Sequence, residues 1–276
     1  MRKKPWIGIF ASLVNSLHII ACSLGTPPPQ NAVKNATVTR NEHNPLITPE
    51  SNISIGENIN GPSIILVPSW VEKPLGKYYM YFAHHHGDYI RLAYANVLAG
   101  PWTIYEPGTL NLRDLKTFKD HIASPDVHVD GKAKEIRMYF HGTTDRGGQE
   151  TGVAFSKDGI VFKASDKILG TYYFRVFEWR GHFFAIAKNK KNGGILLYSK
   201  NGITPFKKIS DIIPRMRHAA VLLHDDILAI FYTRIGDAPE HILMSTISLT
   251  NDWKNWVVSK PIEIYVFFLL YHLLFH

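Results

Sequence analysis

The chain has one cysteine, Cys22, among its 276 residues, so no disulfide can form within it. It has no Walker loop, no glycine-rich dinucleotide fingerprint after a strand and no zinc-finger spacing, which argues against nucleotide chemistry and zinc-finger folds. The net charge is +8, but lysine and arginine are scattered and do not run together on one element. We therefore expect a solvated basic surface, with an anionic ligand as a further option, and no nucleic-acid partner.

Residues 1–22 have the pattern of an export signal peptide. Basic residues at 2–4 precede an apolar run at 6–20, which is too short for a convincing membrane span. Residues 19–22 resemble a bacterial lipobox, in which the cysteine is acylated and becomes the mature N-terminus. The sequence therefore predicts an exported protein that is lipid-anchored through Cys22 in the bacterial cell envelope, facing the periplasm or the surface. An ordinary secretion signal with an incidental cysteine is the alternative.

The chain at 42–264 repeats one cassette four times: a short apolar strand, a turn, an aromatic strand and a charged loop. The aromatic strands at 78–82, 136–140, 182–186 and 228–232 start 58, 46 and 46 residues apart. Repeats of about 40 to 60 residues that contain only strands indicate propeller blades. We therefore predict an all-β propeller domain at 42–264, preceded by a flexible tether at 23–41 that is rich in Pro, Thr and Asn.

The opening strand of each cassette is expected to lie innermost, where neighbouring blades bury it on both sides. These strands are predicted at 61–67, 124–129, 173–177 and 217–223, and outer strands at 100–103 and 252–256 close the first and fourth cassettes. In such a blade, the start of the first strand and the loop after the second strand share a face. Because these loops are long and polar, we predict the functional site on that face.

Three short motifs carry a resemblance to a known superfamily. Residues 124–127 (Ser-Pro-Asp-Val), 217–221 (Arg-His-Ala-Ala-Val) and 100–102 (Gly-Pro-Trp) look like those of the five-bladed β-propeller glycosidases, the arabinanase, xylosidase and invertase-like families. The resemblance covers roughly residues 43–264 and is closer to an uncharacterised bacterial group of that superfamily. It implies a five-bladed propeller of which four blades are recognisable here and the last is missing or incomplete.

The resemblance implies three carboxylates around a central pocket: a base, an acid and an aspartate that tunes the acid. Glycoside hydrolysis needs such a set because one group protonates the leaving oxygen while another activates water or attacks. Asp126 matches the tuning aspartate. His218 matches an axial histidine that in some members holds a water or a metal in the channel; no other cofactor is implied.

Two departures from the family pattern affect the chemistry. Residues 60–62 read Asn-Gly-Pro where the base is expected, and 172–174 read Tyr-Tyr-Phe where the acid is expected. Glu178 is predicted near the opposite end of its strand. Either catalysis has moved to Asp237 and Glu240 with the loop histidines, or it depends on the absent blade, or the protein binds sugar without turnover.

Histidines and arginines of the same face are the predicted substrate contacts. They are His84, His85, Arg91, His128, His141, Arg175, Arg217, His218 and Arg234. The guanidinium groups offer a bidentate fork to a carboxylated or sulfated sugar, although single arginines more commonly form surface ion pairs. No metal site is predicted from residues 84–86, because alternate histidines on a strand point in opposite directions.

The lead hypothesis is a glycoside hydrolase-like protein acting on a plant or algal oligosaccharide or polysaccharide that carries negative charge, with Asp126, Asp237 and Glu240 as catalytic candidates. The alternatives are a carbohydrate-binding propeller without activity and an inactive truncated fragment. Residues 265–276 form an atypical tail without turn residue, carboxylate or alternation. They are predicted either as a final buried strand or as the product of a shifted reading frame or a truncated gene.

Overall fold

A computed structural model describes residues 41–189, 191 and 193–266 of the chain. Within these residues sixteen strands form four sheets of four strands, which we name blades 1 to 4 in chain order. Blade 1 contains β1 (Ile59–Leu66), β2 (Tyr78–His84), β3 (Arg91–Ala95) and β4 (Thr103–Tyr105), and blade 2 contains β5 (Phe118–Asp130), β6 (Glu135–Thr144), β7 (Gln149–Ser156) and β8 (Lys163–Ala164). Blade 3 contains β9 (Arg175–Trp179), β10 (His182–Lys188), β11 (Gly193–Ser199) and β12 (Lys207–Pro214), and blade 4 contains β13 (Met216–His224), β14 (Ile227–Arg234), β15 (His241–Ser248) and β16 (Ile262–Val266).

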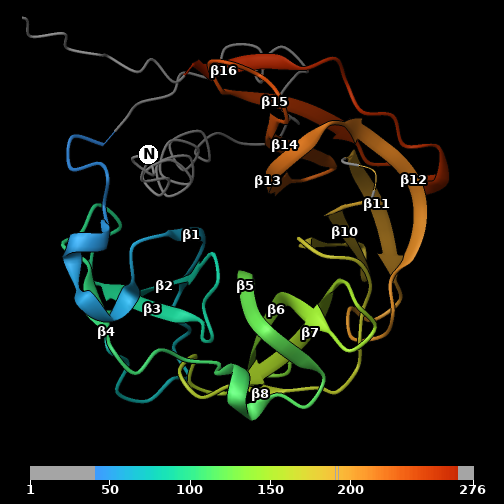
Figure 1. Cartoon of the computed structure of the whole chain (residues 1–276). Coiled ribbons are helices and arrows are strands. Elements are labelled where there is room, and N and C mark those ends of the chain that lie inside the picture. The colour runs from blue at the N-terminus through green and yellow to red at the C-terminus, as the bar shows by residue number, and fades with distance from the viewer. Residues whose placement is uncertain (1–40, 190, 192, 267–276) are drawn as a thin grey trace, which may run out of the picture.

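Each blade is an antiparallel meander whose strands pair in chain order. Figure 1 shows the four sheets around a common centre, with β1, β5 and β13 toward it and β4, β8 and β12 away from it. The predicted all-β propeller fold is therefore confirmed, with four blades among the described residues. A fifth blade stays a prediction, and the tail beyond residue 266 lies outside the described part.

The helical elements are single 3₁₀ turns that connect or flank the blades. They are η3 (Pro49–Ser51), η4 (Ile53–Ile55), η5 (Leu112–Asp114) and η6 (Trp253–Asn255). Within the described ranges, none of the helices has the length and the apolar character needed to cross a membrane.

The outer strand of blade 4 differs from the prediction. The segment 252–256 forms η6, and the outer strand is β16, which pairs with β15 about ten residues later in the chain. The rings of this segment pack on blade 3: Trp253 stacks on Tyr198 at 4.8 Å between centroids, and Trp256 lies 4.7 Å from Phe184. Burial of these two large rings against the neighbouring blade stabilises the turn in place of an extended edge strand.

The inner strands are irregular at the end that faces the centre of the ring. Register shifts occur between Asn60 and Ser63 in β1, between Ala123 and Asp126 in β5, and between Met216 and Ala219 in β13. In addition, Ser124 and Tyr173, the latter just before β9, have positive φ values of 50° and 67°. A bulge turns side chains away from the regular ladder, so each blade directs polar residues toward one central space.

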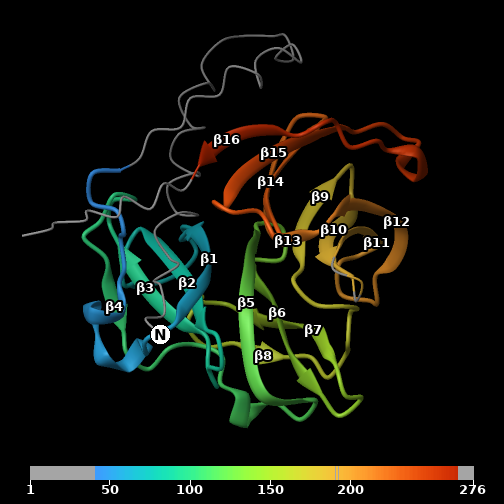
Figure 2. The same cartoon turned by 45° about the horizontal axis from the view of Figure 1, so that its top comes forward.

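Two buried tyrosines join neighbouring blades, one between blades 1 and 2 and one between blades 2 and 3. In blade 1, the Tyr81 hydroxyl donates to the carbonyl of Gly159, in the turn after β7, at 2.8 Å. In blade 2, the Tyr139 hydroxyl donates to the carbonyl of Gly202, in the turn after β11, at 3.0 Å. Both glycines have positive φ and would place a Cβ atom within 2.8 Å of the tyrosine oxygen, so the contact requires glycine. Figure 2 shows blade 2 between blade 1 and blade 3.

Replacing Tyr81 with phenylalanine should lower the free energy of unfolding by about 1–3 kcal/mol, because the buried Gly159 carbonyl loses its donor. Tyr78→Phe is the matched control, since the Tyr78 hydroxyl has no hydrogen bond within the described chain. Urea unfolding of both variants measures the difference. Equal loss of stability in the two variants would show that the contact between blades contributes nothing.

Candidate functional site

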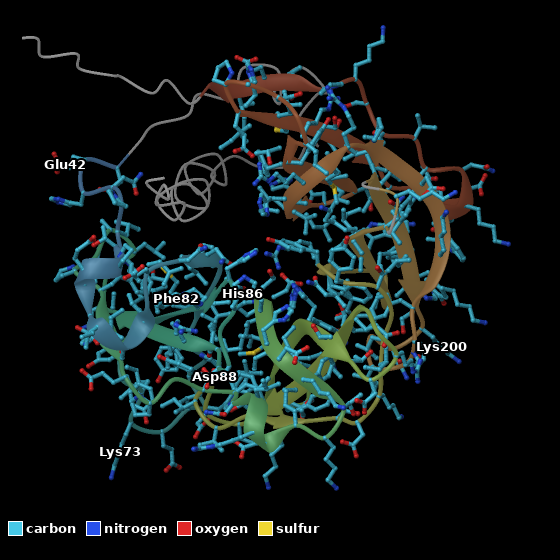
Figure 3. The ribbon with its side chains drawn as sticks, viewed as in Figure 1. Glu42, Lys73, Phe82, His86, Asp88 and Lys200 are labelled. Atoms are coloured by element: carbon cyan, nitrogen blue, oxygen red, sulfur yellow. The ribbon has the colours of Figure 1, made fainter. Side chains whose placement is uncertain are left out.

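The irregular ends of the inner strands enclose a cavity of about 680 Å³ at the centre of the ring. All four blades contribute to its lining, and the side chains are mainly polar. They include Asn58, Asn60, Ser63, His85, His86, His121, Ser124, Asp126, His128, His141, Gln149, Tyr173, Arg175, Lys188, Arg217 and His218. In Figure 3, His86 lies toward the centre of the ring, whereas Lys73 and Lys200 lie on its outer side. The predicted face therefore carries a concave site.

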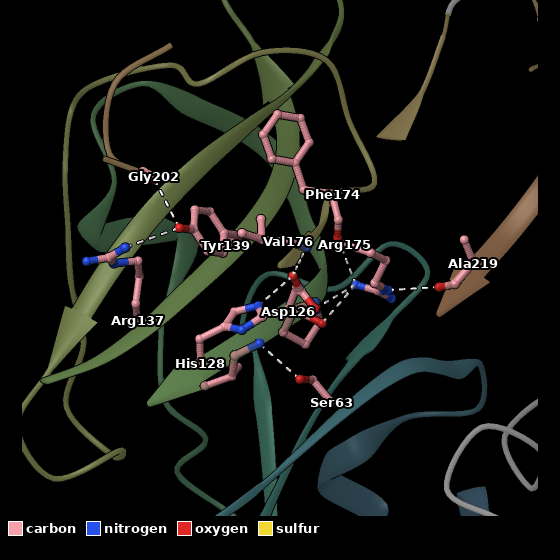
Figure 4. Close-up of polar contacts among 12 residues, drawn as sticks. Ser63, Asp126, His128, Arg137, Tyr139, Phe174, Arg175, Val176, Gly202 and Ala219 are labelled. Carbon is pink, nitrogen blue, oxygen red and sulfur yellow. Dashed lines mark hydrogen bonds and ion pairs between the residues drawn. The ribbon is translucent and has the colours of Figure 1, made fainter. Parts of the chain in front are cut away.

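Asp126 is the one acidic side chain among the described residues that line this cavity, and it is 8% exposed. Its Oδ2 atom faces the Nε2 atom of His128 at 2.8 Å and accepts a hydrogen bond from the backbone N–H of Val176 at 2.7 Å. Figure 4 shows these contacts together with the backbone N–H of Val127, which donates to Ser63 Oγ at 2.9 Å. The carboxylate thus joins blade 2 to blade 3.

Burial alone would raise the pKa of the Asp126 carboxyl. The charge and hydrogen bond of His128, the Arg175 guanidinium and the Val176 N–H outweigh this effect and hold the pKa below its usual value. The group is therefore ionised at neutral pH, as a tuning or electrostatic carboxylate must be. It cannot serve as a proton donor there.

Arg175, which is 8% exposed, has a mainly structural role. Its Nε atom donates to the carbonyl of Ala219 at 2.9 Å, and Nη1 donates to the carbonyls of Pro125 and Phe174 at 3.2 and 3.1 Å. The same Nη1 lies 3.9 Å from Asp126 Oδ1. The Arg175 guanidinium therefore connects β5, β9 and β13 at the cavity lining.

Tyr173 lies in the segment 172–174, where the resemblance expects a catalytic acid. Its hydroxyl lies 2.7 Å from His218 Nδ1, so blades 3 and 4 meet in a tyrosine–histidine pair. Burial raises the pKa of Tyr173, although a hydrogen bond to Ser124 and the Arg175 charge oppose the rise. Burial, followed by the charge of Arg217, lowers the pKa of His218 to about 3. The pair is uncharged at neutral pH, and the tautomer of His218 decides which of the two groups donates the hydrogen bond.

A chain of neighbouring rings continues from this pair across the cavity. Centroid distances are 5.2 Å from Tyr173 to His141, 6.2 Å from His141 to His121, and 6.4 Å from His121 to His86. His141 is 4% exposed, and its Nδ1 atom has no hydrogen-bond partner among the described residues. Burial, with His121 as the next cause, lowers the pKa of His141 to about 3.

Positive charge collects where blades 3 and 4 meet. Lys188, at the end of β10, and Arg217, in the bulge of β13, both line the cavity. Burial and the nearby Arg217 guanidinium lower the pKa of the Lys188 ammonium. This wall therefore favours negatively charged ligands over cations.

Three of the predicted contacts with substrate, His84, Arg91 and Arg234, lie outside the cavity lining. Arg91 is buried in blade 1, where its Nε and Nη1 atoms donate to the carbonyls of Ile55 and Tyr89 at 2.8 and 2.9 Å. Arg234 lies over the Tyr232 ring at 5.7 Å. Of the other predicted contacts, all but His84 line the cavity, namely His85, His128, His141, Arg175, Arg217 and His218. His84 accepts a hydrogen bond from the backbone N–H of His86 at 3.2 Å.

Asp237 and Glu240 lie in the loop between β14 and β15, outside the cavity lining. Arg215 donates to Asp237 at 3.3 Å. Glu240 Oε1 lies 3.9 Å from Arg217 Nη1 and has no hydrogen-bond partner among the described residues. Glu240 therefore reaches the cavity only through Arg217. Glu178 lies near the turn between β9 and β10, as expected from the sequence.

Among the histidines and lysines of the described lining, three were not among the predicted contacts: His86, His121 and Lys188. His121 was missed because β5 begins at Phe118, six residues before the predicted strand, and no local pattern marks this extension. Lys188 could have been found, because it ends its aromatic strand at the position that His84 takes in blade 1.

Within the described ranges, no group of three or more His, Cys, Asp or Glu side chains could hold a metal ion. The surroundings of His218 do not suit an axial cation either. The charges of Arg217, Lys188 and Arg175 all act on this imidazole, and its Nδ1 atom faces the Tyr173 hydroxyl. No chemical step is therefore assigned to a metal here.

No model of a known protein family matches this sequence. An uncharacterised protein, R118, of Acanthamoeba polyphaga mimivirus is 33% identical in an alignment 239 residues long, which covers 74% of this chain and 66% of the viral protein. The alignment thus spans slightly less than two thirds of that relative's length.

Among solved structures, an α-L-arabinofuranosidase of Clostridium thermocellum superposes with a TM-score of 0.57 and 14% identity, covering 76% of this chain and 74% of that one. A family 43 β-xylosidase/α-arabinofuranosidase from a compost microbial metagenome, solved with xylotriose, gives a TM-score of 0.57 and 14% identity over 81% of each chain. At such low identity these matches concern the fold alone. The chain has the β-propeller fold of the family 43 glycoside hydrolases.

Asp126→Asn should lower the free energy of unfolding by about 1–3 kcal/mol near neutral pH, because the buried anion has three partners that the amide cannot all satisfy. The folded-state pKa lies below the unfolded value, so this stabilisation is present above the unfolded pKa and is lost as pH falls through the folded pKa. Asp130→Asn is the control, since its Oδ1 accepts only from the N–H groups of Lys132 and Ala133. If the difference in free energy of unfolding between Asp126→Asn and the wild type does not become smaller in acid, the assignment of an ionised Asp126 is contradicted.

The two neutral imidazoles should make the fold sensitive to mild acid. His141 and His218 have folded pKa values of about 3, whereas free histidine titrates at about 6.5. The unfolded state therefore takes up protons as pH falls below about 6.5, and stability falls with it. Chemical unfolding between about pH 7 and about pH 5 should give a shallower pH slope for the double variant His141→Gln/His218→Gln than for the wild type. An identical slope would show that these side chains titrate normally in the fold.

Proposed function

We propose that the protein binds a carbohydrate in the central cavity. The observation that carries this proposal is the lining: among the described residues, imidazoles, amides, one tyrosine–histidine pair and three cations surround a single, engaged carboxylate. Sugars offer many hydroxyl groups that accept and donate hydrogen bonds, and a concave polar site that converges from four blades suits them. The fold supports the same class of ligand, since the metagenomic relative was solved with xylotriose.

The lining favours binding over hydrolysis. Hydrolysis by a carboxylate pair needs two carboxyl groups about 5–5.5 Å or about 6.5–9.5 Å apart. The resemblance expects the base in the segment 60–62 and the acid in the segment 172–174. Asn60 and Tyr173 of these segments line the cavity, and neither side chain replaces a carboxylate. Among the described lining residues, Asp126 is therefore left without a second carboxylate.

A glycoside hydrolase acting on a plant or algal polysaccharide is the second candidate. Asp126 favours it, because a buried ionised carboxylate at the centre of this fold can stabilise a positive charge that develops in the transition state. Glu240 is the described carboxyl group with the best connection to the site, since it pairs with Arg217, and Asp237 lies three residues before it. Turnover would require one of them to move toward the cavity.

Export and lipid anchoring at Cys22 in a bacterial envelope also belong to this proposal. They are supported by the charged, apolar and small-residue order of the first 22 residues. Such a location would present the cavity to polysaccharide outside the cytoplasm.

The test is calorimetric titration of the full chain with arabino-, xylo- and uronate-containing oligosaccharides, with chromatography of the same mixtures for released sugars. We expect saturable binding without product. His86→Ala should weaken binding about tenfold, equivalent to about 1.4 kcal/mol, whereas Lys200→Ala on the outer side should not. Released sugar that disappears in Asp126→Asn would favour the hydrolase instead, and absence of binding throughout the series would refute the proposal.

A further inference from the structure

The wall formed by blades 3 and 4 carries more positive charge than the one carboxylate of the cavity lining balances. Among the described lining residues, Arg175, Lys188 and Arg217 are cationic, and Asp126, on blade 2, is the one anionic side chain. Arg175 already contacts three backbone carbonyls and faces Asp126, and Arg217 pairs with Glu240 outside the lining. The charge that no described carboxylate balances is therefore that of Lys188.

Lys188 is held in place by its backbone, whose N–H donates to the carbonyl of Tyr172 at 3.1 Å. Its ammonium group lies 6.0 Å from the centroid of the Tyr172 ring. Within residues 41–189, 191 and 193–266 the ammonium has no ion pair and no side-chain hydrogen bond. A half-buried ammonium without counter-charge is costly, and an anion brought by a ligand would offset that cost.

Arg217 adds its charge from the neighbouring blade. It has an ion-pair partner, Glu240, at 3.9 Å. Even so, its guanidinium is the second cause, after burial, of the lowered pKa values of both Lys188 and His218. The two cations therefore act on one small region of the cavity that both of them line, and like charges placed together in a cavity suggest a ligand site.

The groups beside this region are polar and uncharged. The Tyr173–His218 pair is neutral at physiological pH, and the buried His141 Nδ1 atom lacks a partner in the described part of the chain. On blade 1 the lining side chains Asn58 and Asn60 carry no charge. The cavity thus has a cationic end on blades 3 and 4 and an uncharged polar end on blade 1.

We propose that Lys188 and Arg217 form a subsite for the anionic substituent, a carboxylate or a sulfate, of an acidic sugar, while the uncharged part of the ligand lies toward blade 1. This rests on the proposed function, that the cavity binds carbohydrate. The guanidinium provides a planar fork and the ammonium a compact point charge, which together can hold either group. The charge of Asp126 is already balanced by Arg175 at 3.9 Å and by His128 at 2.8 Å.

Matched acidic and neutral sugars test the subsite by calorimetry. The probes are an oligogalacturonate with its methyl ester, and a sulfated oligosaccharide with its desulfated form. At least one acidic probe should bind about tenfold or more tightly than its neutral partner, a difference of about 1.4 kcal/mol. Lys188→Met should abolish this preference and keep the fold. Lys200→Met, which removes the same charge from the outer side, should retain it.

Titration with sodium sulfate alone separates the two proposals, with the histidine ring resonances followed by NMR. Sulfate should shift the His218 signals in the wild type and in Lys200→Met, and leave them unmoved in Lys188→Met. Unmoved wild-type signals, or an acidic preference that survives Lys188→Met, would refute the subsite. Equal binding of neutral and acidic sugars would refute the subsite and keep carbohydrate binding. A sulfate response without binding of any sugar would keep the subsite and refute carbohydrate binding.

Discussion

The contact between the Asp126 carboxylate and its partners is the interaction on which the centre of the molecule depends. Asp126 binds His128 in its own blade and the Val176 N–H in blade 3. Arg175 continues the connection to Ala219 in blade 4. Apolar faces alone would let neighbouring blades slide, whereas these directional contacts fix three inner strands relative to one another. The shape of the cavity follows, because its lining is carried on the bulged ends of those same strands.

The repeating part of the fold could be predicted because the strands and turns of each blade are contiguous in the sequence. Aromatic strands at a regular spacing and turns with glycine or aspartate predict a propeller without knowledge of any contact between blades. The outer strand of blade 4 could not be predicted, because Trp253 and Trp256 pack on blade 3, and a contact between blades leaves no periodic signal. The extension of β5 that carries His121 was missed for a similar reason, since a bulge interrupts the alternation that marks a strand.

The site shows the same division. Asp126 and His218 were predicted at the cavity because each opens an inner strand, and the structure places both in the lining. The partner of His218 could not be predicted, because the Tyr173–His218 pair joins residues 45 positions apart in different blades. The predicted arginine cluster is divided by the structure, since Arg91 is engaged with blade 1 carbonyls while Arg217 faces the cavity. A shared fold with hydrolases therefore says less about the chemistry than the loss of carboxylates from this lining.

The central claim is that the cavity holds an acidic sugar with its anionic group on blades 3 and 4. A crystal structure of the protein with a bound acidic oligosaccharide tests it most directly. We expect density for the sugar inside the ring, with its carboxylate or sulfate against Lys188 and Arg217. We expect no carboxyl group of the protein other than that of Asp126 to contact the sugar. A sugar bound on the outer face, or one whose anionic group points to Asn58 and Asn60, would contradict it.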